Sequence, residues 1–206
     1  MAAVRAAVYN SPMPDRFLFL LGSGRTEGNT ERLARRAASA LPMGTECRWL
    51  RLAELPLEPF ADLRHQPGGG YAVPEGNAAT LLEATLWASD LVVAAPTYWY
   101  ALPAAAKLYF DHWTGWLRVA GLDFRSRMAG RKLWLVTVNA DGPDESGASD
   151  LLVATLERTA AYMGMRFAGA LVGRGNRPGE VSGDAAALAQ AERFFLAGRG
   201  RPGGPG

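Results

Sequence analysis

Short apolar runs alternate five times along the chain with segments of helical periodicity. These strand candidates cover residues 16–21, 46–52, 90–95, 132–138 and 166–172, and only 46–52, ECRWLRL, is a mixture of apolar and polar residues. The segments with helical spacing follow them at residues 29–41, 77–88, 102–116, 149–163 and 183–197. Strands that are apolar along their whole length are typical of a parallel sheet covered by helices on both faces. Five such units suit an open, doubly wound α/β sheet and are too few for an eight-stranded barrel.

The alternation defines one domain over residues 16–197, with an irregular segment at each end. Residues 1–15 show no sustained periodicity, so we expect a flexible N-terminal arm. Residues 198–206, GRGRPGGPG, consist mostly of Gly and Pro and predict a disordered tail. Within the domain, residues 55–76 hold four prolines and a triple glycine, Gly68 to Gly70, which predicts a long loop.

The composition excludes several kinds of site. The chain has one cysteine, Cys47, and two histidines, His65 and His112, so it cannot form an internal disulfide, a cysteine-ligated metal centre or a three-histidine metal site. We therefore expect no metal and, because no disulfide is required, a cytoplasmic location. No apolar run approaches the length of a membrane span. The net charge of +2, from 22 basic and 20 acidic residues, argues against a nucleic-acid partner.

The loop after the first apolar run, residues 22–30, has the composition of an anion site. Its small residues let backbone N–H groups close around an anion, and the helix that follows adds partial positive charge. Arg25 offers a forked donor to a phosphate oxygen. The glycines are spaced one residue too far apart for a dinucleotide loop, and the Lys of a Walker A loop is missing. A terminal monophosphate suits this hydroxyl-rich loop; the alternative is a plain strand–helix turn.

Three consecutive aromatic residues, Tyr98, Trp99 and Tyr100, follow the third apolar run. They cannot all face the core from a strand–helix loop, and in an open sheet this loop borders the ligand crevice. Pro96 and Pro103 fix the ends of the loop. We expect the aromatic residues to stack on a flat, conjugated ligand. A dimer interface is an alternative that is compatible with this prediction.

These two loops together resemble those of a known family. The first is the motif Gly22-Ser23-x-Arg25-x-x-Gly28-Asn29-Thr30. The second is the strand at 90–95 followed by Pro96-x-Tyr98-Trp99, with Pro103, Lys107 and Asp111. In both loops the chain resembles the flavodoxin-like NAD(P)H-dependent FMN reductase and quinone reductase superfamily. The resemblance extends over residues 16–197 in element order. It implies a parallel sheet of strand order 2-1-3-4-5 and a bound FMN, with its phosphate on the first loop and its isoalloxazine ring beside the third. The cofactor-binding residues that we predict are Ser23, Gly24, Arg25, Gly28, Asn29, Thr30, Pro96, Thr97, Tyr98, Trp99, Tyr100, Asn139, Asp141 and Gly142.

The loop after the fourth strand departs from the pattern of the superfamily. Such proteins often carry a Thr-Gly-Gly-type stretch there, whereas this chain has Thr137-Val138-Asn139-Ala140-Asp141-Gly142. Asn139 and Gly142 can still present donors to the edge of the ring. We expect Asp141 to point away, because a negative charge beside a flavin would disfavour an anionic reduced ring.

The resemblance also implies an activity. NAD(P)H, either NADH or NADPH, would transfer a hydride to N5 of the flavin, and a small acceptor such as a quinone, an azo or nitro compound or free flavin would then be reduced. The flavin carries the chemistry, so no catalytic acid or base is expected. We further expect a homodimer, in which Tyr71 and His65 of the long loop either contact the flavin of a partner subunit or are ordinary loop residues. The alternatives are an electron-transfer flavodoxin, a regulatory flavin-binding protein and a nucleotide-binding module without flavin.

Overall fold

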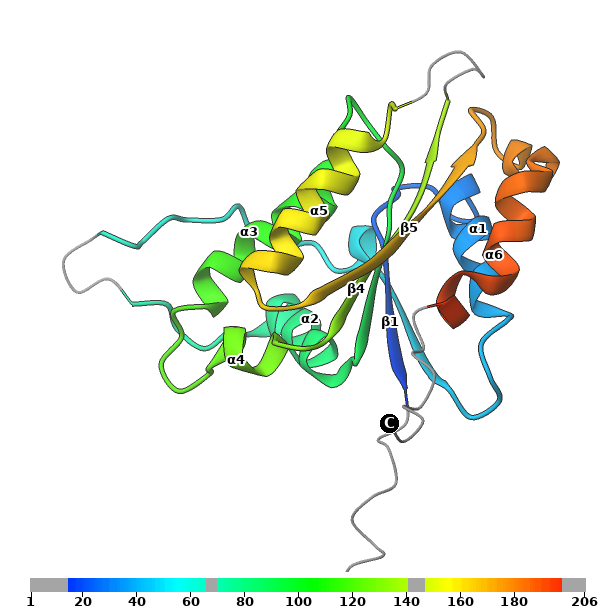
Figure 1. Ribbon diagram of the computed structural model, residues 1–206. Coiled ribbons are helices and arrows are strands. Elements are labelled where there is room, and N and C mark those ends of the chain that lie inside the picture. Colours follow the sequence, from blue (N-terminus) through cyan, green and yellow to red (C-terminus); the bar gives the residue numbers. More distant parts are fainter. Residues whose placement is uncertain (1–14, 66–69, 141–146, 198–206) are drawn as a thin grey trace, which may run out of the picture.

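The computed structural model describes residues 15–65, 70–140 and 147–197 (Figure 1). The predicted arm, apart from Asp15, and the predicted tail at 198–206 lie outside the described residues. The same holds for Gly68 and Gly69 of the triple glycine, and for Asp141 and Gly142 of the predicted site. Among the described residues, no helix combines the length and the apolar character that a bilayer crossing requires.

Five strands form one sheet in the order β2-β1-β3-β4-β5, and every neighbouring pair is parallel. This confirms the predicted α/β fold class and strand order. The strands are β1 (Arg16–Leu21), β2 (Glu46–Arg51), β3 (Asp90–Ala94), β4 (Lys132–Asn139) and β5 (Arg166–Arg174). All five residues of β3, in the middle of the sheet, are buried, as expected for a mainly apolar central strand. The one charged residue, Asp90, accepts a hydrogen bond from the indole N–H group of Trp134 at 2.9 Å.

Helices cover both faces of the sheet (Figure 1). The helices are α1 (Asn29–Ala38), α2 (Gly76–Trp87), α3 (Ala104–Trp116), α4 (Phe124–Met128), α5 (Asp150–Tyr162) and α6 (Ala185–Ala197), with short 3-10 turns η1 (Leu52–Glu54) and η2 (Glu180–Gly183). Because side chains alternate between the two faces along a strand, β1 contributes side chains to two core layers, one on each face of the sheet. Leu18 and Leu20 pack with α2, α3 and α5, whereas Phe17, Phe19 and Leu21 pack with α1 and α6.

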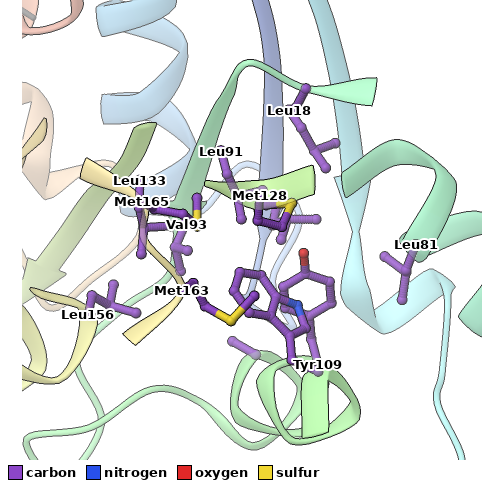
Figure 2. Close-up of a cluster of buried hydrophobic side chains, with 14 of the residues drawn as sticks. Leu18, Leu81, Leu91, Val93, Tyr109, Met128, Leu133, Leu156, Met163 and Met165 are labelled. Atoms are coloured by element: carbon purple, nitrogen blue, oxygen red, sulfur yellow. The ribbon is translucent and has the colours of Figure 1, made fainter. Parts of the chain in front are cut away.

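The larger core layer lies between the sheet and helices α2, α3, α4 and α5 (Figure 2). Tyr109 of α3 is fully buried there, and its hydroxyl lies 2.6 Å from the hydroxyl of Thr85 on α2. Burial raises the pKa of Tyr109, because the phenolate would lose its hydration. The neutral hydroxyl is therefore a structural hydrogen-bonding group that ties α3 to α2.

Besides small shifts at the ends of other elements, two helix starts and one additional helix differ from the sequence-based prediction, each for a local reason. Helix α3 begins at Ala104 rather than at residue 102, because Pro103 occupies the N-cap and disfavours a helical conformation at the preceding residue. Helix α6 begins at Ala185, since the Asp184 carboxylate accepts a hydrogen bond from the Ala187 N–H group at 3.0 Å. Helix α4 is too short to give a periodic pattern, and it follows Asp123 in a left-handed conformation.

Gly22 explains how the first loop can lie against the third. A Cβ atom at this position would lie 2.9 Å from the Cβ of Ala95 and 3.1 Å from the Cβ of Ala106. The N–H group of Gly22 donates to the carbonyl of Ala94 at 2.9 Å, so the two strand ends remain paired up to the point where the loops diverge. Glycine is therefore required here by the close approach of β1, β3 and α3.

Candidate functional site

A cavity of about 600 Å³ opens at the carboxyl end of the sheet, which is within the usual size range of small-molecule sites. Loops that follow β1, β3, β4 and β5 line it. The residues that line the cavity are Ser23, Arg25, Gly28, Asn29, Thr30, Pro96, Thr97, Tyr98, Trp99, Val138, Ala140, Gly175, Asn176 and Pro178. The predicted first and third loops therefore face one shared cavity, although Gly24 and Tyr100 do not line it.

The N-terminus of α1 points into this cavity without a side-chain cap. Gly28 is the N-cap residue and makes no side-chain hydrogen bond. The first turn of a helix leaves N–H groups without intrahelical partners, and the helix dipole makes that end partly positive. Thr30 is buried in this turn, and no acidic side chain in the described part of the chain pairs with Arg25. The Arg25 guanidinium and the N–H groups of the first helical turn are thus available to an anion, whereas the backbone N–H groups of Arg25 and Glu27 are bonded within the loop and to Glu31.

Asn29 lines the cavity, and its carboxamide makes hydrogen bonds within the protein. Its carboxamide nitrogen donates to the carbonyl of Arg177 at 2.9 Å, and its carboxamide oxygen accepts from the N–H group of Gly179 at 2.8 Å. The side chain therefore joins the start of α1 to the loop after β5. Its own backbone N–H group, at the uncapped helix end, remains as a donor toward the cavity.

The loop after β5, residues 175–179, is the part of the site that the sequence analysis missed. The Glu180 carboxylate fixes its conformation by accepting hydrogen bonds from the N–H groups of Asn176 and Arg177, each at 2.8 Å. These bonds hold the pKa of Glu180 below its usual range, because they stabilise the charged form. The stretch Gly-Asn-Arg-Pro-Gly after an apolar run was the available signal, because every strand–helix loop of a parallel sheet lies at the same edge.

The aromatic residues of the third loop occupy a two-residue turn. Tyr98 and Ala101 exchange two backbone hydrogen bonds of 3.0 Å, and the residues between them have positive φ angles of 49° for Trp99 and 62° for Tyr100. Positive φ at both central positions is the pattern of a type I′ turn, which favours Asn and Gly. Two bulky residues here store backbone strain, a feature that clusters at functional sites.

We expect Trp99→Gly to raise the stability of the protein and to weaken ligand binding at the site. The indole is 94% exposed, so its removal loses almost no burial. A non-glycine residue in the left-handed region costs about 1–2 kcal/mol, which the greater flexibility of unfolded glycine offsets in part. Thermal unfolding of the ligand-free protein should show a gain of about 0.5–1 kcal/mol. Trp99→Ala is the matched control, because it removes the indole and keeps the strain; equal stabilities of the two variants would contradict the strain argument.

A chain of hydroxyl groups lies behind the third loop. The Thr97 hydroxyl is 2.9 Å from that of Thr137 and 3.0 Å from that of Ser149, to which the Asn139 amide donates at 3.2 Å. Thr137 and Ser149 are buried, so these bonds fix the ends of β3 and β4 and the start of α5 relative to one another. Asn139 and Tyr100 line a smaller neighbouring cavity of about 180 Å³.

The long loop after β2 packs against its own chain. The Tyr71 ring stacks on Phe60. It also packs closely against α3, because a Cβ atom added at Gly115 would lie only 2.8 Å from a carbon of this ring. The hydroxyl of Tyr71 accepts a hydrogen bond from the Leu63 N–H group at 2.9 Å, and a ring nitrogen of His112 lies 2.9 Å from the Glu58 carbonyl. These contacts favour the second alternative for Tyr71, an ordinary loop residue, and they make His112 of α3 a packing residue. Lys107 and Asp111 form an i,i+4 ion pair on α3.

A parallel sheet of this strand order, with an uncapped helix end and a small-residue loop after β1, defines the flavodoxin-like class. The chain belongs to the family described as having the flavodoxin-like fold, whose model matches residues 15–195.

Named relatives agree with this membership. A protein of Bacillus subtilis (strain 168), YwqN, assigned by inference as an NAD(P)H-dependent FMN-containing oxidoreductase, is 33% identical over 175 residues, which cover 84% of this chain and 93% of YwqN. The solved Trp repressor binding protein of Bacillus subtilis is 26% identical with a TM-score of 0.66, covering 87% of this chain and 97% of that one. An FMN-dependent NADH-azoreductase of Bacillus anthracis, solved with FMN, shares the fold at 13% identity, with a TM-score of 0.57 and coverage of 89% and 98%.

Proposed function

We propose that this chain is an FMN-dependent NAD(P)H oxidoreductase that reduces a small acceptor such as a quinone, an azo or nitro compound or free flavin. The observation that carries the proposal is that one cavity joins the uncapped N-terminus of α1 to the exposed aromatic turn at 98–100. The family and the inferred assignment of the 33%-identical relative support the same chemistry.

The donor set fits the phosphate end of FMN. A phosphate needs several donors and positive charge, which the backbone N–H groups of the first turn, the hydroxyls of Ser23 and Thr30 and the Arg25 guanidinium supply. The absence of a lysine matches a monophosphate rather than a nucleoside triphosphate. We therefore assign these residues, with Gly28 and the N–H group of Asn29, to the phosphate.

The opposite end of the cavity fits a flat ring. Pro96, Thr97, Tyr98 and Trp99 line it, and the hydroxyl chain behind Thr97 holds this segment in place. In sheets of this order, the crevice where β1 and β3 meet is the general position for such a ligand. The aromatic side chains would cover the ring and exclude water from it.

Bound FMN would accept a hydride from NAD(P)H and pass the electrons to the acceptor. The residues of the chain bind and orient the reacting molecules. Among the described residues that line the cavity, Arg25 carries the only formal charge, and none is Asp, Glu or His. This lining supports a site that positions its ligands and supplies no acid or base.

We extend the proposal to a homodimer located in the cytoplasm. Tyr98, Trp99 and Tyr100 are 50%, 94% and 58% exposed, and aromatic residues of this kind are enriched in protein interfaces. A second hollow of about 230 Å³ lies between α3 and α5, and Leu102, Phe110 and Tyr162 are among the residues that line it. A chain with one cysteine needs no oxidising compartment.

Light scattering in solution should give twice the mass of the chain; the mass of one chain would contradict the dimer.

A turnover assay tests the activity. The FMN-loaded protein is mixed with NADH or NADPH and with a quinone, an azo dye, a nitro compound or free flavin, and oxidation of the nicotinamide is followed with and without the protein. Oxidation that depends on bound FMN and saturates with the acceptor is the expected result. Bound FMN without any oxidation would contradict the enzyme and favour an electron-carrying or regulatory protein.

A further inference from the structure

A buried ion pair lies behind the anion-binding loop, outside the cavity. Glu31 stands in the first turn of α1 with a side chain only 4% exposed, and Arg51 ends β2 with a side chain 11% exposed. Neither residue lines the cavity. Charged side chains are rarely buried this far without a specific partner, so this pair calls for a role of its own.

The pair contacts the loop at two points. The Glu31 carboxylate accepts a hydrogen bond from the N–H group of Glu27 at 2.9 Å and from Arg51 Nη2 at 2.8 Å, both on the same oxygen, Oε2. Arg51 Nη1 donates to the carbonyl of Arg25 at 3.1 Å. Arg51 therefore holds the loop both directly, at Arg25, and through Glu31, at Glu27.

The conformation that these contacts hold is an unfavourable one. Glu27 has a φ angle of 54°, in the left-handed region that non-glycine residues rarely adopt. The Ser23 hydroxyl secures the other side of the turn by accepting from the Arg25 N–H group at 3.1 Å. A loop strained in this way stays in place only when the surrounding structure fixes it, and the Glu31–Arg51 pair supplies that fixation from behind.

Arg51 also helps to neutralise the negative charge of Glu31, which lies beside the proposed phosphate site. An unpaired carboxylate at Glu31, one residue after Thr30, would repel a phosphate. Burial acts to raise the pKa of Glu31, but the hydrogen bonds from Arg51, Arg35 and the Glu27 N–H group outweigh it and hold the pKa below its usual range. The carboxylate is therefore ionised, and the two guanidinium groups neutralise it.

We propose that Arg51 is a positioning residue for the phosphate of the cofactor, acting through Glu31 and through the backbone of residues 25–27. This inference rests on the proposed function and adds to it a residue that does not touch the ligand. A pair that merely joined β2 to α1 would affect folding alone, whereas a positioning residue affects the recognition of a phosphate group.

The comparison of FMN with riboflavin, which lacks the phosphate, separates these roles. Apoprotein is titrated with each flavin, and binding is followed by quenching of flavin fluorescence. For Arg51→Met we expect the Kd for FMN to rise at least about tenfold, as for the loss of one charge-assisted contact, with the Kd for riboflavin changed less than about twofold. Arg48→Met is the matched control: Arg48 lies on the same strand and pairs with exposed Glu83, and its removal should change neither Kd.

A second variant covers the case in which Arg51→Met does not fold. Arg51→Lys keeps the charge but lacks the fork that reaches both Arg25 and Glu31, so it should show the same selective loss of FMN binding. The proposal is overturned if the folded variants keep the wild-type preference for FMN over riboflavin, or if they lose affinity for both flavins equally. A wild-type protein that shows no preference for FMN would instead contradict the proposed function.

Discussion

The paired substitution Arg25→Ala and Thr30→Ala is expected to weaken FMN binding about 100-fold. Each residue would donate to the charged phosphate, and one hydrogen bond to a charged group contributes about 1.5 kcal/mol. Two such bonds amount to about 3 kcal/mol, which corresponds to about two orders of magnitude in Kd. Titration of apoprotein with FMN, followed by flavin fluorescence, measures the change directly.

The control for this variant changes the same residue types at exposed positions away from the cavity. Thr80 lies on α2 and Arg193 on α6, and neither lines the proposed site. Thr80→Ala with Arg193→Ala should leave the Kd unchanged. An unchanged Kd for the Arg25 and Thr30 pair would show that the phosphate site is misplaced.

Gly175→Ala should destabilise the protein by about 2 kcal/mol and weaken FMN binding about tenfold. A Cβ at this position would lie 2.9 Å from the amide nitrogen of the Asn29 side chain and from the backbone nitrogen of Val181. Backbone atoms cannot move aside cheaply, and such overpacking costs about 1–3 kcal/mol. The loop would shift, carrying Asn176 and Pro178 out of the cavity wall, with a loss of affinity of about one order of magnitude. Chemical denaturation and FMN titration measure the two effects.

Gly183→Ala provides the matched control in the same segment, because a Cβ there would meet no atom within 4 Å. We expect this variant to retain both wild-type stability and wild-type FMN affinity. Equal behaviour of the two alanine variants would show that the close packing around Gly175 contributes nothing to the site.

The fold could be predicted from the sequence because its signals are local. Each buried strand is a short apolar run, and each helix that follows has its own periodicity, so element order and the parallel sheet follow without knowledge of tertiary contacts. The loop that we propose to hold the phosphate is predictable for the same reason: Ser23, Arg25 and Thr30 lie within one strand–helix connection, and the structure brings them to one cavity.

The rest of the site depends on contacts between distant parts of the chain. The carboxamide of Asn29 bonds to Arg177, 148 residues away, and residue type alone gives no indication of that partner. Arg51 reaches Glu31 only because β2 lies beside β1 in the sheet. A sequence without Asn or Gly at the centre of the turn also gave no reason to expect positive φ at Trp99 and Tyr100.

The visible spectrum of the protein under anaerobic conditions is the most direct test of FMN binding and of flavin reduction by NAD(P)H. Purified apoprotein is reconstituted with FMN, separated from free flavin, and mixed with NADH or NADPH in the absence of oxygen. We expect a yellow protein with one FMN for each chain, whose flavin absorbance is bleached by the reduced nicotinamide. A protein that retains no FMN after separation would contradict this expectation.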